Sequence, residues 1–143
     1  MMEPRERPTL TQVFGRFSQL VALRSTCVRL QVGSVITSGD FTRVLSIGYN
    51  GNARGLPNTC DRLEPGNCGC IHSEINALLK LDFTEPQKVM FLTDSPCSAC
   101  AKAMINAGIS QVYYLREYRK ADGLALLAQA GIPSELLSLP PDL

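Results

Sequence analysis

The chain has 143 residues, 45% of them hydrophobic, and its 14 basic and 13 acidic residues leave a formal net charge of +1. This length and composition predict a single globular domain over residues 1–143 with one core. A charge so close to zero argues against proteins that bind the phosphate backbone of nucleic acids, which carry a strong basic bias, and favours a small-molecule substrate.

The termini and the six cysteines indicate the cellular setting. No apolar run reaches membrane-spanning length, and the charged N-terminus lacks the apolar segment of a secretory leader. We therefore expect no membrane partner and a cytoplasmic location. Thiols stay reduced there, so the cysteines favour metal binding over a disulfide framework.

The first predicted elements are a helix over residues 9–27 and a β-hairpin. Apolar side chains recur with helical spacing in the first segment, chiefly at Val13, Phe14, Phe17, Leu20 and Val21. Residues 31–37 and 43–49 are rich in β-branched side chains and flank a short turn around Gly39. They predict two antiparallel strands.

A long segment without periodicity follows, over residues 50–70. It contains four glycines, two prolines and three cysteines. A structureless loop of this length in a small domain calls for a specific reason, and metal binding is the one we infer.

The rest of the chain alternates helices with strands. The pattern predicts helices over residues 71–81, 97–107 and 121–130, and strands over 88–93 and 111–115. Gly108 and Gly131 follow two of these helices, where a glycine commonly ends a helix. This order predicts an α/β fold, in which a sheet with one antiparallel pair and parallel crossovers is covered by helices on both faces.

Two short stretches, His72-Ser73-Glu74 and Pro96-Cys97-Ser98-Ala99-Cys100, match the H-x-E … P-C-x-x-C signature of zinc-dependent nucleobase deaminases. A hydrolytic zinc site takes three protein ligands and keeps a fourth position for water, whose pKa falls to about 7. We predict His72, Cys97 and Cys100 as these ligands. Glu74 would carry protons between the water, the ring nitrogen and the departing ammonia.

Other interpretations of these residues remain open. A C-x-x-C pair also occurs in thiol redox proteins, which would cycle Cys97 and Cys100 without a metal. A single histidine is often an ordinary surface or core residue, and a zinc-binding module without activity would have no use for Glu74. The pairing of His72 with Glu74 and a downstream P-C-x-x-C favours the metal site.

Four cysteines remain once Cys97 and Cys100 are assigned, and they form a complete tetrahedral set for a structural zinc. They are Cys27, Cys60, Cys68 and Cys70. Such a zinc would pin the long loop against the first helix and set the position of Asn50. The alternative is four unpaired thiols, with Cys27 buried on the first helix and the others on a mobile loop.

Five segments resemble the deoxycytidylate (dCMP) deaminases, in order and with similar spacing: residues 24–27 (R-S-T-C), 32–36 (V-G-S-V-I), 48–51 (G-Y-N-G), 72–77 (H-S-E-I-N-A) and 95–102 (S-P-C-S-A-C-A-K). The likeness runs from about Ser18 to Pro133. It implies a three-layer α/β/α cytidine deaminase-like fold with a mixed five-stranded sheet. It also implies hydrolysis of dCMP to dUMP and ammonia, in the supply of pyrimidine deoxynucleotides for dTTP.

The resemblance implies roles for individual residues. His72, Cys97 and Cys100 would bind the catalytic zinc beside the proton carrier Glu74. Nucleotide contacts would come from backbone around Ser73 and Ser95, from Asn50 at the sugar, and from Tyr118. A 5′-phosphate needs cationic donors, for which Arg24, Arg54, Arg119 and Lys120 are candidates. Each could equally be a solvated surface charge, and the turn at Asn50 also forms for purely conformational reasons.

Two departures from the family pattern concern substrate and regulation. The usual H-A-E is H-S-E here, which adds a hydroxyl and could tune acceptance of a C5 substituent, so a C5-modified dCMP is an alternative substrate. Cytidine and deoxycytidine are others, and bases in nucleic acid are disfavoured by the near-neutral charge. Relatives are often hexamers activated by dCTP and inhibited by dTTP, which implies a homo-oligomer, but the segment before His72 is short beside some of them.

Overall fold

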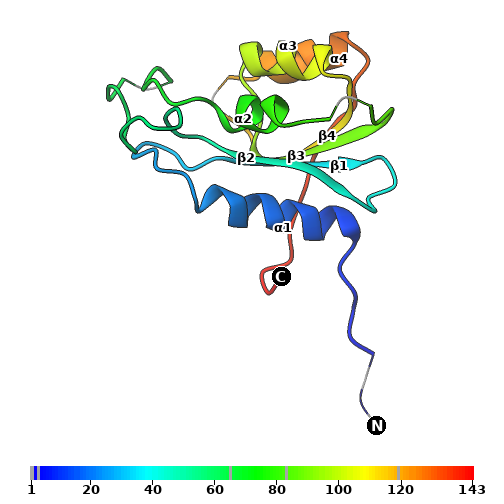
Figure 1. Ribbon diagram of the computed structural model, residues 1–143. Helices are drawn as coiled ribbons and strands as arrows, with labels where there is room; N and C mark the ends of the chain where they lie inside the picture. The colour runs from blue at the N-terminus through cyan, green and yellow to red at the C-terminus, as the bar shows by residue number, and fades with distance from the viewer. Residues whose placement is uncertain (1, 3, 65, 83, 119) are drawn as a thin grey trace.

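A mixed five-stranded sheet forms the middle layer of the molecule (Figure 1). Its strand order is β2-β1-β3-β4-β5. The computed structural model describes residues 2, 4–64, 66–82, 84–118 and 120–143. The strands are β1 (Gly33–Ser38), β2 (Val44–Tyr49), β3 (Lys88–Asp94), β4 (Ile109–Arg116) and β5 (Ser134–Leu136). Strand β1 pairs antiparallel with both β2 and β3, and β3, β4 and β5 are parallel. The predicted hairpin and parallel crossovers are confirmed.

Helices cover both faces of this sheet, as the α/β/α prediction requires (Figure 1). Helix α1 (Leu10–Ala22) lies on one face, and α2 (Ser73–Leu79), α3 (Ser98–Asn106) and α4 (Asp122–Gln129) lie on the other. Each face has its own buried apolar cluster. Because the central strands β1 and β3 are fully buried, apolar side chains alternate between the two clusters along them.

Helix α1 is shorter than the predicted 9–27. A capping box between Thr9 and Gln12 starts it, and a turn after Ala22 ends it, where the Ser25 N–H donates to the Ala22 carbonyl. The Ser25 hydroxyl then donates to the Asn50 carbonyl at 2.8 Å. This contact draws the chain away from the helix axis, so Cys27 lies in the connection between α1 and β1 rather than on the helix.

Strand β5 is the element that residue patterning missed, although the resemblance implied five strands. It has only three residues and is paired on one side, to β4. A segment this short shows no recognisable period. Its pairing is decided by the parallel crossover through α4, which returns the chain to the edge of β4.

Close backbone packing fixes α2 over β2. A Cβ atom on Gly48 would overlap the carbonyl oxygen of Ser73 and the backbone nitrogen of Ala77. Only a glycine at this position lets the helix lie directly on the strand. Since α2 begins at Ser73, this contact sets the height of His72 and Glu74 above the sheet.

The connection from β2 to α2 is the long loop that the sequence predicts. Its described residues form neither a helix nor a strand, apart from a bridge at its base where Gly51 and Ile71 exchange two backbone hydrogen bonds. Among the described helices, none has the length and apolar character needed to cross a bilayer.

Candidate active site

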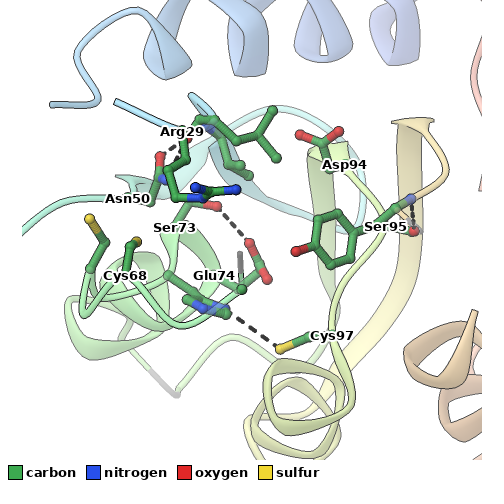
Figure 2. A pocket seen from close by; sticks show the side chains of 14 residues that line it. Arg29, Asn50, Cys68, Ser73, Glu74, Asp94, Ser95 and Cys97 are labelled. Atoms are coloured by element: carbon green, nitrogen blue, oxygen red, sulfur yellow. Dashed lines mark hydrogen bonds between the residues drawn. The ribbon is translucent and has the colours of Figure 1, made fainter. Parts of the chain in front are cut away.

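The three predicted catalytic-zinc ligands meet where two helices begin. His72 is the N-cap of α2, Cys97 is the N-cap of α3, and Cys100 lies in the first turn of α3. The His72 Nδ1 atom is 3.5 Å from the Cys97 Sγ, a contact drawn as a dashed line in Figure 2, and 3.2 Å from the Cys100 Sγ. The three donor atoms all lie within 4.8 Å of one another. The crossover from β3 to α3 therefore brings together residues that are 25 or more positions apart.

The charges of this cluster suit a divalent cation. Hydrogen bonds from Cys100 and His72 lower the pKa of the Cys97 thiol to about 4, whereas the bond to Cys97 and burial raise the pKa of Cys100. Hydrogen bonding to Cys97 also raises the pKa of the His72 imidazole. These shifts favour the thiolate of Cys97, and a cation bound among the three side chains would displace protons from the other two.

The donor set also fits zinc geometrically. Tetrahedral zinc with ordinary bond lengths separates a nitrogen ligand from a sulfur ligand by about 3.5 Å. The His72 to Cys97 separation agrees with this value, and the His72 to Cys100 separation is slightly shorter. Three protein ligands of this kind are typical of catalytic zinc, because they keep one coordination position for water or substrate.

Glu74 lines the same cavity from the first turn of α2, and its side chain is only 4% exposed. Burial raises the pKa of this carboxyl group. The Ser73 hydroxyl donates to Glu74 Oε1 at 2.6 Å (Figure 2). The hydroxyls of Ser34 and Ser73 lie 2.7 Å apart. Two hydroxyls in series therefore hold the carboxylate in one orientation at the cavity wall.

We expect this hydroxyl pair to show strong thermodynamic coupling. Ser73→Ala leaves the buried Ser34 hydroxyl and a Glu74 oxygen without their partner, which costs about 1–3 kcal/mol of unfolding free energy. In the double variant Ser34→Ala, Ser73→Ala no Ser34 hydroxyl is left without a partner. The double variant should therefore lose less unfolding free energy than the two single variants lose together. Urea unfolding of the four proteins checks this, and strict additivity would contradict the observed pair.

The cavity lies between the β1 side of the sheet, the long loop and the ends of β3 and β4. Its described lining consists of Arg29, Leu30, Val32, Asn50, Gly66, Cys68, Cys70, His72, Ser73, Glu74, Asp94, Ser95, Cys97 and Tyr118. The predicted catalytic and base-edge residues thus line one cavity, except Cys100, which is buried and is not part of the lining.

Two predicted nucleotide contacts, Asn50 and Ser95, line the cavity with side-chain atoms that are already engaged in hydrogen bonds. The Asn50 amide accepts from the Val32 N–H at 2.8 Å and donates to the Leu30 carbonyl at 2.7 Å. The Ser95 hydroxyl accepts from the Tyr118 N–H at 2.7 Å. Asn50 and Ser95 thereby hold neighbouring wall segments in place, and their contacts to a nucleotide stay predictions.

The predicted phosphate contacts are placed differently. The Arg24 guanidinium lies 5.8 Å above the Tyr49 ring and does not line the cavity. Arg54 and Lys120 are exposed outside it, and Arg119 falls outside the described residues.

Sequence reasoning missed Arg29, which among the described residues is the one arginine or lysine in the cavity wall (Figure 2). Its position after Cys27 in the connection to β1 carries no pattern that could have predicted this. The Arg29 guanidinium also donates to the Leu63 carbonyl of the long loop.

The other four cysteines meet in a second cluster beside the cavity. Cys27 comes from the connection between α1 and β1, and Cys60, Cys68 and Cys70 come from the long loop. The sulfur separations are 3.6 Å between Cys60 and Cys27, 3.7 Å between Cys60 and Cys70, and 3.8 Å between Cys27 and Cys68. All four sulfurs lie within 4.8 Å of one another. Tetrahedral zinc with four thiolates separates its sulfurs by about 3.8 Å.

The thiols of this cluster differ in acidity. Burial opposes ionisation of Cys27, but the backbone N–H groups of Leu30 and Arg29 outweigh it and bring the pKa of this thiol to about 7. Burial and hydrogen bonds to neighbouring cysteines raise the pKa of Cys70. The lowered pKa favours the thiolate of Cys27, and a cation bound by the cluster would ionise the other three thiols as well.

Comparison with known proteins agrees with this geometry. Residues 9–116 match the family model described as the cytidine and deoxycytidylate deaminase zinc-binding region. This match covers most of the chain and contains both ligand motifs. The chain belongs to the cytidine and deoxycytidylate deaminase family. The sequence-based identification of this family is confirmed, and so is the cytidine deaminase-like fold.

Individual relatives of this family member differ in length. Deoxycytidylate deaminase of Saccharomyces cerevisiae is 34% identical over 144 aligned positions, which cover 92% of this chain but only 46% of the yeast protein. ComE operon protein 2 of Bacillus subtilis is 36% identical, covering 94% of this chain and 74% of that protein. The chain thus spans about half the length of the yeast relative.

A solved structure aligns over its whole length. The crystal structure of dCMP deaminase from the cyanophage S-TIM5, in complex with dCMP and dUMP, superposes with a TM-score of 0.82 at 32% identity. The alignment covers 93% of this family member and all of the phage chain.

Proposed function

We propose that this chain catalyses the zinc-dependent hydrolytic deamination of dCMP to dUMP and ammonia. The observation that carries the proposal is the meeting of His72, Cys97 and Cys100 with the buried carboxylate of Glu74 at one cavity. The phage relative supports the substrate, since it was solved with dCMP and dUMP bound. Such an activity belongs to the supply of pyrimidine deoxynucleotides.

His72, Cys97 and Cys100 would hold the zinc, which when bound acts as a Lewis acid that activates water. The overall step forms a bond from the water oxygen to C4 of cytosine and breaks the bond from C4 to the exocyclic nitrogen. The two protons of the water end on N3 and on the departing ammonia. Glu74 accepts each proton and delivers it, because its carboxylate reaches the cavity and is held by the Ser73 hydroxyl.

The position of Arg29 in the cavity wall supports a nucleotide, rather than a nucleoside, as the substrate. A guanidinium is a preferred partner of a phosphate group. We expect Arg29→Gln to raise the KM for dCMP about tenfold or more while kcat changes little, since a charge-assisted hydrogen bond contributes about 1.5–3 kcal/mol. Turnover of deoxycytidine should be unaffected. The matched control Arg24→Gln, outside the cavity wall, should leave both KM values unchanged.

Steady-state kinetics of these variants on the two substrates measure the effect. An equal loss of kcat/KM on dCMP and deoxycytidine in Arg29→Gln would contradict phosphate binding. It would show instead that Arg29 stabilises the loop through the Leu63 carbonyl.

The proposed activity itself is tested by ammonia release from dCMP, deoxycytidine and CMP side by side, with and without dCTP. Preferred turnover of dCMP supports the proposal. Preferred turnover of deoxycytidine or cytidine would replace dCMP by a nucleoside. If none reacts while zinc is bound, 5-hydroxymethyl-dCMP and a cytosine-containing oligonucleotide are the next substrates. Because the Ser73 hydroxyl donates its proton to Glu74, it is not free to donate to a C5 substituent of the base. Such a substituent would need a hydrogen-bond donor from another residue.

We also propose that Cys27, Cys60, Cys68 and Cys70 bind a structural zinc. Their sulfur separations match those of a tetrahedral four-cysteine site. Closed four-ligand sites of this kind stabilise structure and take no part in the chemistry. This zinc would clamp a loop without regular structure, whose residues Cys68 and Cys70 form part of the cavity wall.

The remaining expectations stay predictions from the sequence and the resemblance. They are a single domain over residues 1–143, a homo-oligomer with a hexamer as the family form, activation by dCTP, inhibition by dTTP, and a cytoplasmic location. Light scattering measures the assembly, and initial rates with each nucleotide measure the regulation. The near-neutral charge supports the prediction of no nucleic-acid partner.

A further inference from the structure

The cavity wall holds a second buried carboxylate that the proposed chemistry does not use. Asp94 is the last residue of β3, its side chain is 4% exposed, and it lines the cavity together with Glu74. In Figure 2, Asp94 and Arg29 both lie above Glu74 in the view, and Cys97 lies below Glu74.

Asp94 is held rigidly by its neighbours. Arg116 lies opposite it on β4, and its Nε donates to Asp94 Oδ1 at 2.5 Å. The Thr93 hydroxyl donates to Oδ2 at 3.2 Å. Next to the pair, the Ser95 N–H donates to the Arg116 carbonyl at 2.9 Å. The carboxylate is therefore held between the ends of β3 and β4 by one hydrogen bond to each oxygen.

This carboxylate keeps free capacity as an acceptor. A carboxylate has about four lone-pair sites, and the interactions above occupy one on each oxygen. It can accept further hydrogen bonds but donate none. Arg116 balances its charge, which reduces the repulsion that an acidic side chain would exert on a nucleotide phosphate bound at Arg29.

The chemistry of the substrate then selects one partner. Apart from the ionised phosphate, dCMP carries two hydrogen-bond donors, the exocyclic amino group and the 3′-hydroxyl. The amino group must face Glu74 and the zinc ligands in order to leave as ammonia. A base at that end and a phosphate at Arg29 place the sugar at the end of the cavity where Asp94 lies.

We propose that Asp94 is a specificity residue that accepts a hydrogen bond from the 3′-hydroxyl of the bound deoxynucleotide. The inference rests on the proposed function, since it takes the substrate to be a cytosine nucleotide. It predicts that the site selects nucleotides that carry a sugar hydroxyl. It also assigns Arg116 as a positioning residue, which acts through Asp94.

The test compares dCMP with 2′,3′-dideoxycytidine 5′-monophosphate, which lacks only the 3′-hydroxyl. The full chain loaded with zinc should lose about 10- to 100-fold in kcat/KM on the dideoxy compound, the range for a hydrogen bond to a charged group. The kcat/KM of Asp94→Asn on dCMP should fall by a similar factor. Its kcat/KM values on dCMP and on the dideoxy compound should then be nearly equal. Arg116→Gln, which keeps the carboxylate, should still discriminate between them.

Three outcomes would overturn the inference. The unaltered chain could turn over both compounds equally, which needs no variant to fold. Asp94→Asn could lose activity equally on both, which would show a structural role only. A loss confined to 5-hydroxymethyl-dCMP would place the contacting hydroxyl on the base. Failure of the unaltered chain to deaminate dCMP at all would instead refute the proposed function, so the two failures are distinguishable.

Discussion

Replacing Glu74 by glutamine should reduce turnover of dCMP by a factor of about 10²–10⁴ or more, with the fold and the bound zinc unchanged. General acid–base groups contribute rate factors of this size, and an amide can neither accept nor deliver the proton. Glutamine keeps the volume of the buried side chain and can still accept from the Ser73 hydroxyl. The measurement is ammonia release at saturating substrate, with zinc content and thermal unfolding recorded on the same samples.

A matched control for this variant is Glu135→Gln on strand β5. Glu135 is exposed and does not line the cavity, so this change should leave turnover within about twofold of the unaltered chain. A Glu74→Gln enzyme as active as the unaltered chain would refute the proton-carrier role. Activity lost together with zinc would show that Glu74 acts on the metal site instead.

Replacing Cys60 by serine should lower the zinc content from two ions per chain to one and destabilise the protein. Cys60 contacts both Cys27 and Cys70, so its loss opens the four-cysteine cluster and releases the long loop. If this costs ~2 kcal/mol or more of unfolding free energy, the melting temperature falls by about 4–8 °C. Metal analysis of freshly purified protein and calorimetry measure both effects.

Cys97→Ser is the matched control for the cysteine change. It should also leave one zinc per chain, but it should abolish turnover because it removes a proposed ligand of the catalytic zinc. Cys60→Ser should keep a measurable kcat and raise KM, since Cys68 and Cys70 form part of the cavity wall. One zinc per chain in the unaltered protein, with Cys60→Ser as stable as the parent, would refute the structural zinc.

The meeting of the proposed catalytic residues was predictable because their motifs are local. Cys97 and Cys100 stand three residues apart at a helix start, where both can face one way, and Glu74 follows His72 by two residues on another helix start. Such spacing translates directly into geometry. The hairpin and the parallel crossovers were predictable for a similar reason, since apolar periodicity identified their elements.

Residues whose roles depend on contacts between distant segments were not predictable. Arg29 and Asp94 lie in no motif of the chain, and they enter the cavity wall because the connection before β1 meets the end of β3 there. The predicted phosphate candidate Arg24 lies over the Tyr49 ring instead. It follows the end of α1 at Ala22, whereas the sequence predicted that this helix continues to Cys27. The end of a helix is decided by such contacts as that of Ser25 with Asn50.

The sequence by itself thus determined the α/β order of elements and the candidate residues for the chemistry, namely the proposed zinc ligands and the proposed proton carrier, all of which follow from residue identity and short-range spacing. The tertiary structure alone decided which charged side chains reach the cavity, how Ser34 and Ser73 hold Glu74, and that Cys27 joins three loop cysteines at tetrahedral spacing. The physical reason is that these contacts are set by the packing of segments far apart in the chain, which no local pattern of side chains encodes.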